Sequence, residues 1–167
     1  MADALVHFIC GSTGAGKTSY AIALAARIGA ARFSIDEWMS LLFWPDAPQP
    51  IDPGWALERV ERCRSLIWST AADIGGRGMP CVLEIGLTSV AARKAMAATA
   101  SEARLTHCFY LLDTPAEERW RRVEARNRAG SAQLDFAITR EMFDYVETMW
   151  EPPSAEEYGN HDWVIVR

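Results

Sequence analysis

The stretch "GSTGAGKT", residues 11–18, decides how the chain folds. It follows the apolar run "ALVHFIC" and leads into "SYAIALAARIG", so a glycine-rich turn joins a predicted strand to a predicted helix. Glycines let the chain wrap closely, and successive backbone N–H groups can then point inward at an anion. The helix that begins there adds the positive end of its dipole. The stretch therefore predicts a phosphate-binding loop.

The residue types within this loop fit a nucleoside triphosphate and a magnesium ion. Lys17 is placed to reach the β- and γ-phosphates, and the Thr18 hydroxyl is placed to ligate Mg²⁺. A glycine-rich turn with an incidental Lys-Thr pair would explain neither the spacing nor the position between strand and helix. We expect ATP and Mg²⁺ at this Walker A loop. Its predicted nucleotide contacts are Gly11, Ser12, Thr13, Gly14, Ala15, Gly16, Lys17, Thr18 and Ser19.

Composition limits what else the chain can be. Its 167 residues, 50% of them hydrophobic, can bury one sizeable core, so we expect a single domain over residues 1–167. The net charge of −5 argues against a general affinity for nucleic acid or anionic membranes, because both require a basic surface. No apolar stretch approaches the roughly 20 residues that span a bilayer. We expect a soluble, cytoplasmic protein.

The four cysteines show no pattern of their own. Neither a metal-site spacing nor a disulfide framework is visible among them. Three of the four fall inside predicted strands, and free cysteine is among the most buried residue types. We expect buried, unpaired thiols at Cys10, Cys63, Cys81 and Cys108.

The rest of the sequence alternates between short apolar runs and helical patterns. Apolar runs bounded by turn residues are typical of buried parallel strands. We expect strands at 5–10, 32–35, 81–85, 106–112 and 163–166. Helical periodicity and capping residues predict helices over 17–28, from about 57 to 74, from Pro115 onward and around 143–150. Because strands that alternate with helices require right-handed crossovers, we expect an α/β fold with helices on both faces of a parallel sheet.

Three segments together carry a family resemblance: the loop at 11–18, "FSIDEWM" at 33–39 and "LLDTPAEERWRRVEARN" at 111–127. The chain resembles the small P-loop kinases, a group classed with AAA-family ATPases. Within it the pattern is most similar to chloramphenicol phosphotransferase, the zeta toxins and the kinase domain of polynucleotide kinase. This resemblance implies a three-layer P-loop NTPase fold with a five-stranded parallel sheet in the order 2-3-1-4-5. It also implies a small lid near residues 119–137.

Asp36 follows the predicted second strand and precedes a short predicted helix. In an open parallel sheet the ligand crevice lies at the carboxyl ends of the strands, so Asp36 should face the phosphate loop. A carboxylate there can take the proton from an acceptor hydroxyl or orient it for attack. The resembled kinases have an aspartate at the corresponding point. Asp36 could instead cap the helix, and the two roles are compatible.

Two further acids end predicted strands. Glu84 ends "CVLE", which by the resemblance lies beside the first strand, and could hold a Mg²⁺-bound water or contact the substrate. Asp113 ends "CFYLLD", which has the form of a Walker B segment. The Thr114-Pro115 capping pattern follows at once and favours a turn role for it. Spacing alone leaves open whether Asp36, Glu84 or Asp113 assists Mg²⁺.

Three arginines recur at spacings of three and four in the helix predicted from Pro115. Arg119, Arg122 and Arg126 therefore share one helix face and can form an anion clamp. In the resembled kinases the equivalent helix opens a lid whose arginines close over ATP. We expect all three to contact the nucleotide, with Arg122 and Arg126 also acting in catalysis. A solvated face paired with neighbouring glutamates is the alternative.

The phosphate acceptor is specified less well. A nucleoside-monophosphate kinase would need arginines near the second strand to hold an acceptor phosphate, yet "IDEWMSLLFW" offers an acid and bulky apolar groups. A hydroxyl on a small, partly apolar molecule is therefore expected. The predicted substrate contacts are Asp36, Trp38, Glu84 and Arg93, although core packing would also explain Trp38 and solvent exposure would also explain Arg93.

Together these features predict an ATP-dependent P-loop kinase. It would transfer the γ-phosphate to the acceptor hydroxyl, with Asp36 as base and with Lys17, Arg122 and Arg126 stabilising the transferred group. The alternative is a nucleotide-binding regulator or a zeta-toxin-like protein. The sequence leaves open the acceptor, the choice between ATP and GTP, and the oligomeric state.

Overall fold

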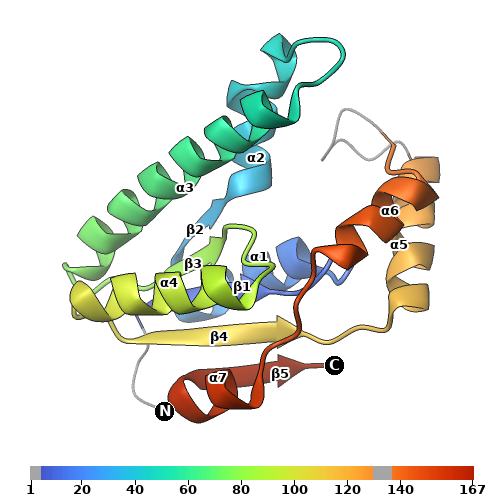
Figure 1. The fold of residues 1–167 in the computed structure, drawn as a ribbon. Coiled ribbons are helices and arrows are strands. Elements are labelled where there is room, and N and C mark those ends of the chain that lie inside the picture. The colour runs from blue at the N-terminus through green and yellow to red at the C-terminus, as the bar shows by residue number, and fades with distance from the viewer. Residues whose placement is uncertain (1–4, 130–136) are drawn as a thin grey trace.

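A five-stranded parallel sheet forms the centre of the molecule (Figure 1). The computed structural model describes residues 5–129 and 137–167. The strands are β1 (Val6–Cys10), β2 (Ala31–Ser34), β3 (Cys81–Glu84), β4 (His107–Leu112) and β5 (Asp162–Val166). Their order is β2-β3-β1-β4-β5, and every neighbouring pair is parallel. The predicted fold class and strand order are confirmed.

Helices cover both faces of this sheet and its carboxyl edge. The helices are α1 (Lys17–Ile28), α2 (Ile35–Leu42), α3 (Pro53–Gly75), α4 (Val90–Glu102), α5 (Ala116–Ala129), α6 (Arg140–Thr148) and α7 (Ala155–Asn160). Figure 1 shows α1 behind the sheet, α3 and α4 in front of it, and α5 with α6 beyond the carboxyl ends of the strands. The hydrophobic core therefore lies on the two faces of the sheet. A ligand-binding site can form at the edge where the carboxyl ends of the strands meet.

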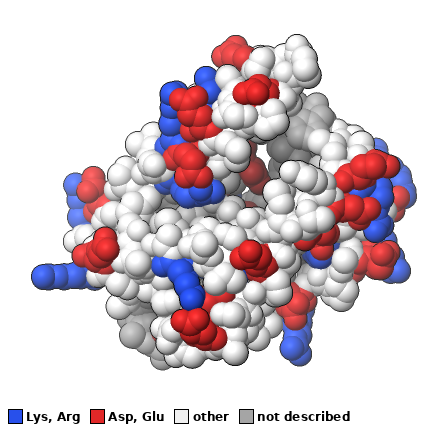
Figure 2. Space-filling model, viewed as in Figure 1, with Lys and Arg blue, Asp and Glu red and all other residues white. Residues whose placement is uncertain are grey.

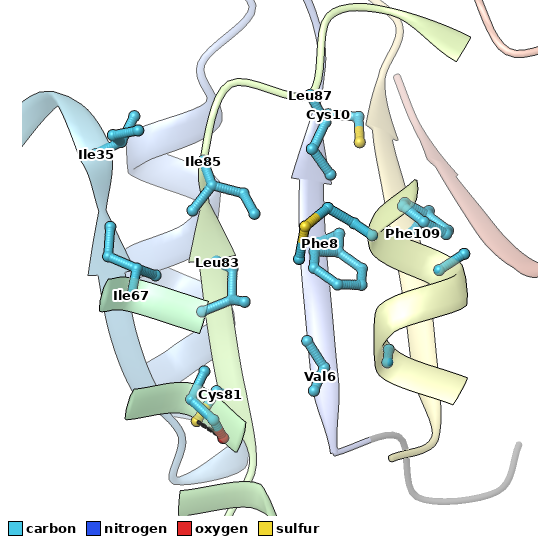
Figure 3. Packing of buried hydrophobic residues seen from close by; sticks show 14 of the residues in the cluster. Val6, Phe8, Cys10, Ile35, Ile67, Cys81, Leu83, Ile85, Leu87 and Phe109 are labelled. Atoms are coloured by element: carbon cyan, nitrogen blue, oxygen red, sulfur yellow. Dashed lines mark hydrogen bonds between the residues drawn. The ribbon is translucent and has the colours of Figure 1, made fainter. Parts of the chain in front are cut away.

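The alternation of side chains along β1 builds a core on each face. Val6 and Phe8 point to the α3–α4 side, where Phe8 stacks on Phe109 at 5.0 Å between ring centroids (Figure 3). Ile9 points to the α1 side, where it packs with Leu24. Because both faces are buried, the strands read as continuous apolar runs in the sequence. All four cysteines are free and buried, as predicted.

The helix boundaries differ from the predictions mainly where a capping residue sets the first turn or where a helix is short. Helix α3 begins at Pro53, a turn earlier than predicted, because the Asp52 carboxylate caps it by accepting the Trp55 N–H at 2.6 Å. Helix α5 begins at Ala116, one residue later than predicted. Helix α7 and a 3₁₀ turn at Trp44–Asp46 were not predicted, because six and three residues are too few for a helical period to show. Within the described residues, no helix has both the length and the apolar character required to cross a membrane.

Candidate active site

The loop between β1 and α1 packs directly against α5. Gly14 and Gly16 adopt left-handed backbone conformations, with φ of 78° and 91°. A Cβ atom at Gly14 would lie 2.6 Å from the Arg119 carbonyl oxygen, so no larger residue fits there without displacing α5. The glycines thus serve two purposes, because they permit the turn and they let another backbone approach it.

Lys17 is folded back over this loop. Its Nζ donates a hydrogen bond to the Ser12 carbonyl oxygen at 3.0 Å. Burial lowers the pKa of the ammonium from its usual 10.5, while the nearby carboxylates of Asp36 and Glu84 act in the opposite direction. The lysine therefore lies between the loop and the two acids predicted to act with it.

A cavity of about 670 Å³ lies between the phosphate loop, α2 and α5. The surface is hollowed between the α2–α3 side and the α5–α6 side of the molecule (Figure 2). The cavity brings together nine predicted site residues from the phosphate loop and three helices: Thr13, Gly14, Gly16, Lys17, Thr18, Ser19, Asp36, Arg122 and Arg126. Its other lining residues are Ser34, Glu37, Ser40, Leu41, Val123 and Ile138.

Asp36 lies in the first turn of α2 and is exposed at the cavity wall. The residue that caps α2 is Ser34, whose hydroxyl accepts the Glu37 N–H at 3.5 Å. The capping role considered for Asp36 is therefore wrong. Asp36 lines the cavity together with residues of the phosphate loop, and its carboxylate does not cap α2.

Glu84 links the loop hydroxyl to the second strand. Its carboxylate accepts hydrogen bonds from Thr18 Oγ1 at 2.9 Å and from Arg32 Nη1 at 3.0 Å, and Arg32 also pairs with Glu37. Burial raises the pKa of this carboxyl above its usual 4.5, against the opposing effects of the Thr18 hydrogen bond and the Arg32 charge. Arg32 thereby has two carboxylate partners at the end of β2.

The oxygen atoms of Thr18 and Glu84 fit a hard cation such as Mg²⁺. No group of three or more His, Cys, Asp or Glu side chains that could hold a metal occurs in residues 5–129 and 137–167. Mg²⁺ usually takes one or two protein oxygens and completes its shell with phosphate and water. Thr18 with Glu84 fits that mode of binding, in which the nucleotide brings part of the coordination shell.

Two of the three predicted arginines line the cavity. Arg122 Nη1 donates to the Ala15 carbonyl oxygen at 3.3 Å, and its other nitrogen pairs with Glu118. Arg126 Nη2 is buried and has no hydrogen-bond partner among the residues that the structure describes. Since a buried guanidinium nitrogen is costly to leave unpaired, its position fits an anionic ligand in the cavity.

Arg119 lies beneath the loop and is buried. Its guanidinium forms a bidentate ion pair with Glu147 of α6, with nitrogen–oxygen distances of 2.7 and 2.5 Å. The same group donates to the Thr13 carbonyl oxygen at 3.1 Å. The predicted contact between Arg119 and the nucleotide stays a prediction, and in this structure each nitrogen of the guanidinium is hydrogen-bonded to a protein partner.

Trp38 and Arg93 lie away from the cavity. Trp38 packs edge-on against Phe33 and belongs to the margin of the core. Arg93 is only 1% exposed and pairs with Glu157 at 2.7 and 3.2 Å, so the alternative explanation by solvent exposure is wrong. A contact between Arg93 and a substrate would require that ion pair to break.

Asp113 follows β4 in the turn before α5, and its carboxylate lies 3.9 Å from Arg167. It is not among the residues that line the cavity. The predicted lid tip falls within residues 130–136 and lies outside the described residues, so the lid near 119–137 stays a prediction.

Several cavity or loop contacts were not predicted from the sequence. Three lining residues are close to Asp36 in or beside α2: Ser34, Ser40 and Leu41. Helical spacing from Asp36 would have been sufficient to predict that they lie near it. Glu147 gives no such signal, because it lies 135 residues from Ser12 and only the fold brings them together.

Comparisons with known proteins identify the family and the fold of the chain. The family model of the AAA domain (AAA_33) matches residues 6–149. Among curated proteins, no sequence matches the chain. The fold is similar to that of a candidate kinase from Chloroflexus aurantiacus, with a TM-score of 0.73, 18% identity, and coverage of 98% of this chain and 84% of that one.

Two further solved structures share the fold. A gluconokinase from Sinorhizobium meliloti has a TM-score of 0.62 and 16% identity, over 96% of this chain and 82% of that one. The Mycobacterium tuberculosis APS kinase, solved with AMPPNP and APS, has a TM-score of 0.61 and 16% identity, over 97% of this chain and 88% of that one. At these identities the likeness concerns the fold.

Proposed function

Because the chain belongs to the AAA domain family AAA_33, with the fold of the small P-loop kinases, we propose that it is an ATP-dependent phosphotransferase. It moves the γ-phosphate of ATP to a hydroxyl of a small, partly apolar molecule. The observation that carries this proposal is that Asp36 on α2, the phosphate loop and Arg126 on α5 line the same cavity.

The proposed roles follow from position and charge. The loop amides and Lys17 hold the β- and γ-phosphates, and Arg122 with Arg126 neutralises the charge that develops during transfer. Asp36 orients the acceptor hydroxyl and accepts its proton as the new oxygen–phosphorus bond forms and the bond between the γ-phosphorus and the β–γ bridging oxygen breaks, which releases ADP. When bound, Mg²⁺ would be held by Thr18 and, directly or through water, by Glu84, and it would neutralise phosphate charge.

The acceptor side of the cavity indicates the kind of molecule that is phosphorylated. Asp36 and Glu37 are acidic, Ser34 and Ser40 are neutral hydrogen-bonding groups, and Leu41 is 79% exposed. The nearby Arg32 is engaged by Glu84 and Glu37. An anionic acceptor would meet unfavourable charge here, so a neutral or cationic molecule with an apolar part fits best.

The test is ATP turnover by the purified protein with Mg²⁺, with and without pooled hydroxyl-bearing metabolites and antibiotics. Acceptor-stimulated turnover is expected in the wild type and in the control Asp73→Asn, which changes an exposed aspartate on α3. Loss of stimulation is expected in Asp36→Asn. Tight ATP binding without stimulation by any pool would instead favour the nucleotide-binding regulator or zeta-toxin-like alternative.

A further inference from the structure

We propose that Glu147 of α6 is a positioning residue that holds the phosphate loop in its phosphate-binding shape. The inference rests on the proposed function only in taking the loop's ligand to be a nucleotide. Glu147 lies outside the predicted site and does not line the cavity. It contacts the loop through the Ser12 side chain and through Arg119.

The contacts of Glu147 converge on two consecutive loop residues. One carboxylate oxygen, Oε1, accepts hydrogen bonds from the Ser12 hydroxyl and from Arg119 Nη1, and Oε2 accepts from Arg119 Nη2. Arg119 Nη1 in turn donates to the Thr13 carbonyl oxygen at 3.1 Å, and Arg119 Nε donates to the Thr114 carbonyl oxygen at 2.8 Å. One carboxylate thus fixes a loop side chain directly and a loop carbonyl through a single guanidinium.

Because the peptide bond is planar, the hydrogen bond from Arg119 to the Thr13 carbonyl also sets the orientation of the next amide, the Gly14 N–H. In a planar trans peptide the N–H points opposite to the carbonyl that precedes it. A Thr13 carbonyl held against Arg119 therefore turns the Gly14 N–H away from Arg119. Because Gly14 lines the cavity, this amide is one of those available to a phosphate. Glycine has no side chain to hold it in place, so its orientation depends on such an external contact.

The segment that contains Glu147 is itself attached to other parts of the fold. Three residues after the end of α6, the Glu151 carboxylate accepts the Val90 N–H at 2.7 Å, and the Glu151 N–H donates to the Thr88 carbonyl oxygen at 2.9 Å. The chain around Glu147 is thereby attached to the start of α4 as well as to the loop. Phe143, one turn earlier on α6, is buried beneath the Arg119 guanidinium at 5.4 Å. Contacts on either side of Glu147 therefore attach this part of the chain to the rest of the fold.

The matched pair of variants is Glu147→Gln and Asp144→Asn. Both convert a carboxylate of α6 to an amide, but Asp144 is exposed and pairs only with Arg140 in the described structure. In the nucleotide-free protein, ¹⁵N relaxation of the Gly14 amide reports loop order directly. We expect a rigid value, an order parameter of about 0.85, in the wild type and in Asp144→Asn, and a clear fall in Glu147→Gln.

Affinity for ATP, measured by calorimetry without any acceptor, is the second readout. Glu147→Gln is expected to bind ATP about tenfold more weakly, and Asp144→Asn within about twofold of the wild type. The milder variant Ser12→Ala, which leaves Arg119 paired, should weaken binding less. Its effect should also be non-additive with that of Glu147→Gln, since both remove the same contact.

The outcomes separate this inference from the proposed function. Unchanged Gly14 order in a folded Glu147→Gln protein, or equal effects of the two α6 variants, would overturn the positioning role. If the wild type binds no ATP while Glu147→Gln still loosens Gly14, the positioning of the loop stands and the proposed function fails. If Glu147→Gln does not fold, the same comparison is made on Arg119→Lys, which keeps the charge but removes the guanidinium that joins Glu147 to the Thr13 carbonyl. Unchanged Gly14 order in that variant would equally overturn the inference.

Discussion

Thr18 Oγ1 donates a hydrogen bond to Glu84 Oε1 at 2.9 Å, so the hydroxyl of the phosphate loop and the acid that ends β3 are in direct contact. The parallel pairing of β1 with β3 produces this contact, because it brings the carboxyl ends of both strands to the same edge. Asp113 ends the neighbouring strand β4 but its carboxylate lies beside Arg167. Of the acids considered for Mg²⁺, Glu84 is thus the one bonded to the loop hydroxyl.

We expect Glu84→Gln to raise the Mg²⁺ concentration needed for half-maximal ATP turnover by about tenfold, because the amide is a weaker ligand for a hard cation. Asp113→Asn is the matched control and should leave the Mg²⁺ requirement unchanged. The measurement is turnover against Mg²⁺ concentration at fixed ATP. A raised Mg²⁺ requirement in Asp113→Asn but not in Glu84→Gln would indicate that Asp113 assists Mg²⁺ binding instead of Glu84.

Lys17→Ala should reduce turnover by about 100-fold or more, because it removes a direct contact with the charge that is transferred. Lys94→Ala is the control, since Lys94 is exposed and pairs with Glu156 on the surface. Steady-state kinetics, with circular dichroism to verify folding, provide the test. Near-normal turnover by a folded Lys17→Ala protein would contradict the assignment of the loop.

Arg126→Ala should lower kcat by about 100-fold and change ATP affinity by less than about fivefold. The reason is that a guanidinium near the transferred group gains most as charge develops. Arg121→Ala, an exposed position on the same helix, should change neither quantity. Separate measurement of kcat and of the ATP dissociation constant decides between the roles, and an effect on affinity alone would make Arg126 a binding residue.

Stability at acid pH should depend on Glu147. The hydrogen bonds from Arg119 lower the pKa of this carboxyl below its usual 4.5, with smaller contributions from Ser12 and from the Lys17 charge. A depressed pKa means that the stabilisation is complete above about pH 4.5 and is lost as pH falls through the folded-state pKa. The difference in free energy of unfolding between the wild type and Glu147→Gln should therefore be constant at pH 5–7 and shrink below pH 4.5. Urea unfolding across this range checks it, and a constant difference down to pH 3 would contradict it.

The sequence predicts well those parts of the fold that local pattern determines. Five apolar runs and the loop at 11–18 were enough for the strands and, with the family resemblance, for their order. The cavity residues Lys17, Asp36 and Arg126 were also predicted, because each is adjacent to a strand end or follows a helical period.

The parts that were not predicted depend on contacts between distant segments. Arg119, Arg122 and Arg126 share one helix face, yet only Arg119 meets a carboxylate of α6, and helical spacing contains no information about that partner. Arg93 has the sequence context of a surface residue on an alanine-rich helix. Its burial follows from Glu157 of α7, a six-residue helix with no periodic signal.

Breaking the buried Arg93–Glu157 ion pair should destabilise the protein far more than breaking the exposed Lys94–Glu156 pair. Glu157→Gln leaves a buried guanidinium without a counter-charge and should lower the free energy of unfolding by about 3 kcal/mol. Glu156→Gln breaks the adjacent pair with Lys94, which is largely solvent-exposed, and should cost no more than about 0.5 kcal/mol. Urea denaturation of both variants tests the difference. Because the two glutamates are consecutive on α7, equal effects would mean that loss of the helix rather than the buried charge determines the result.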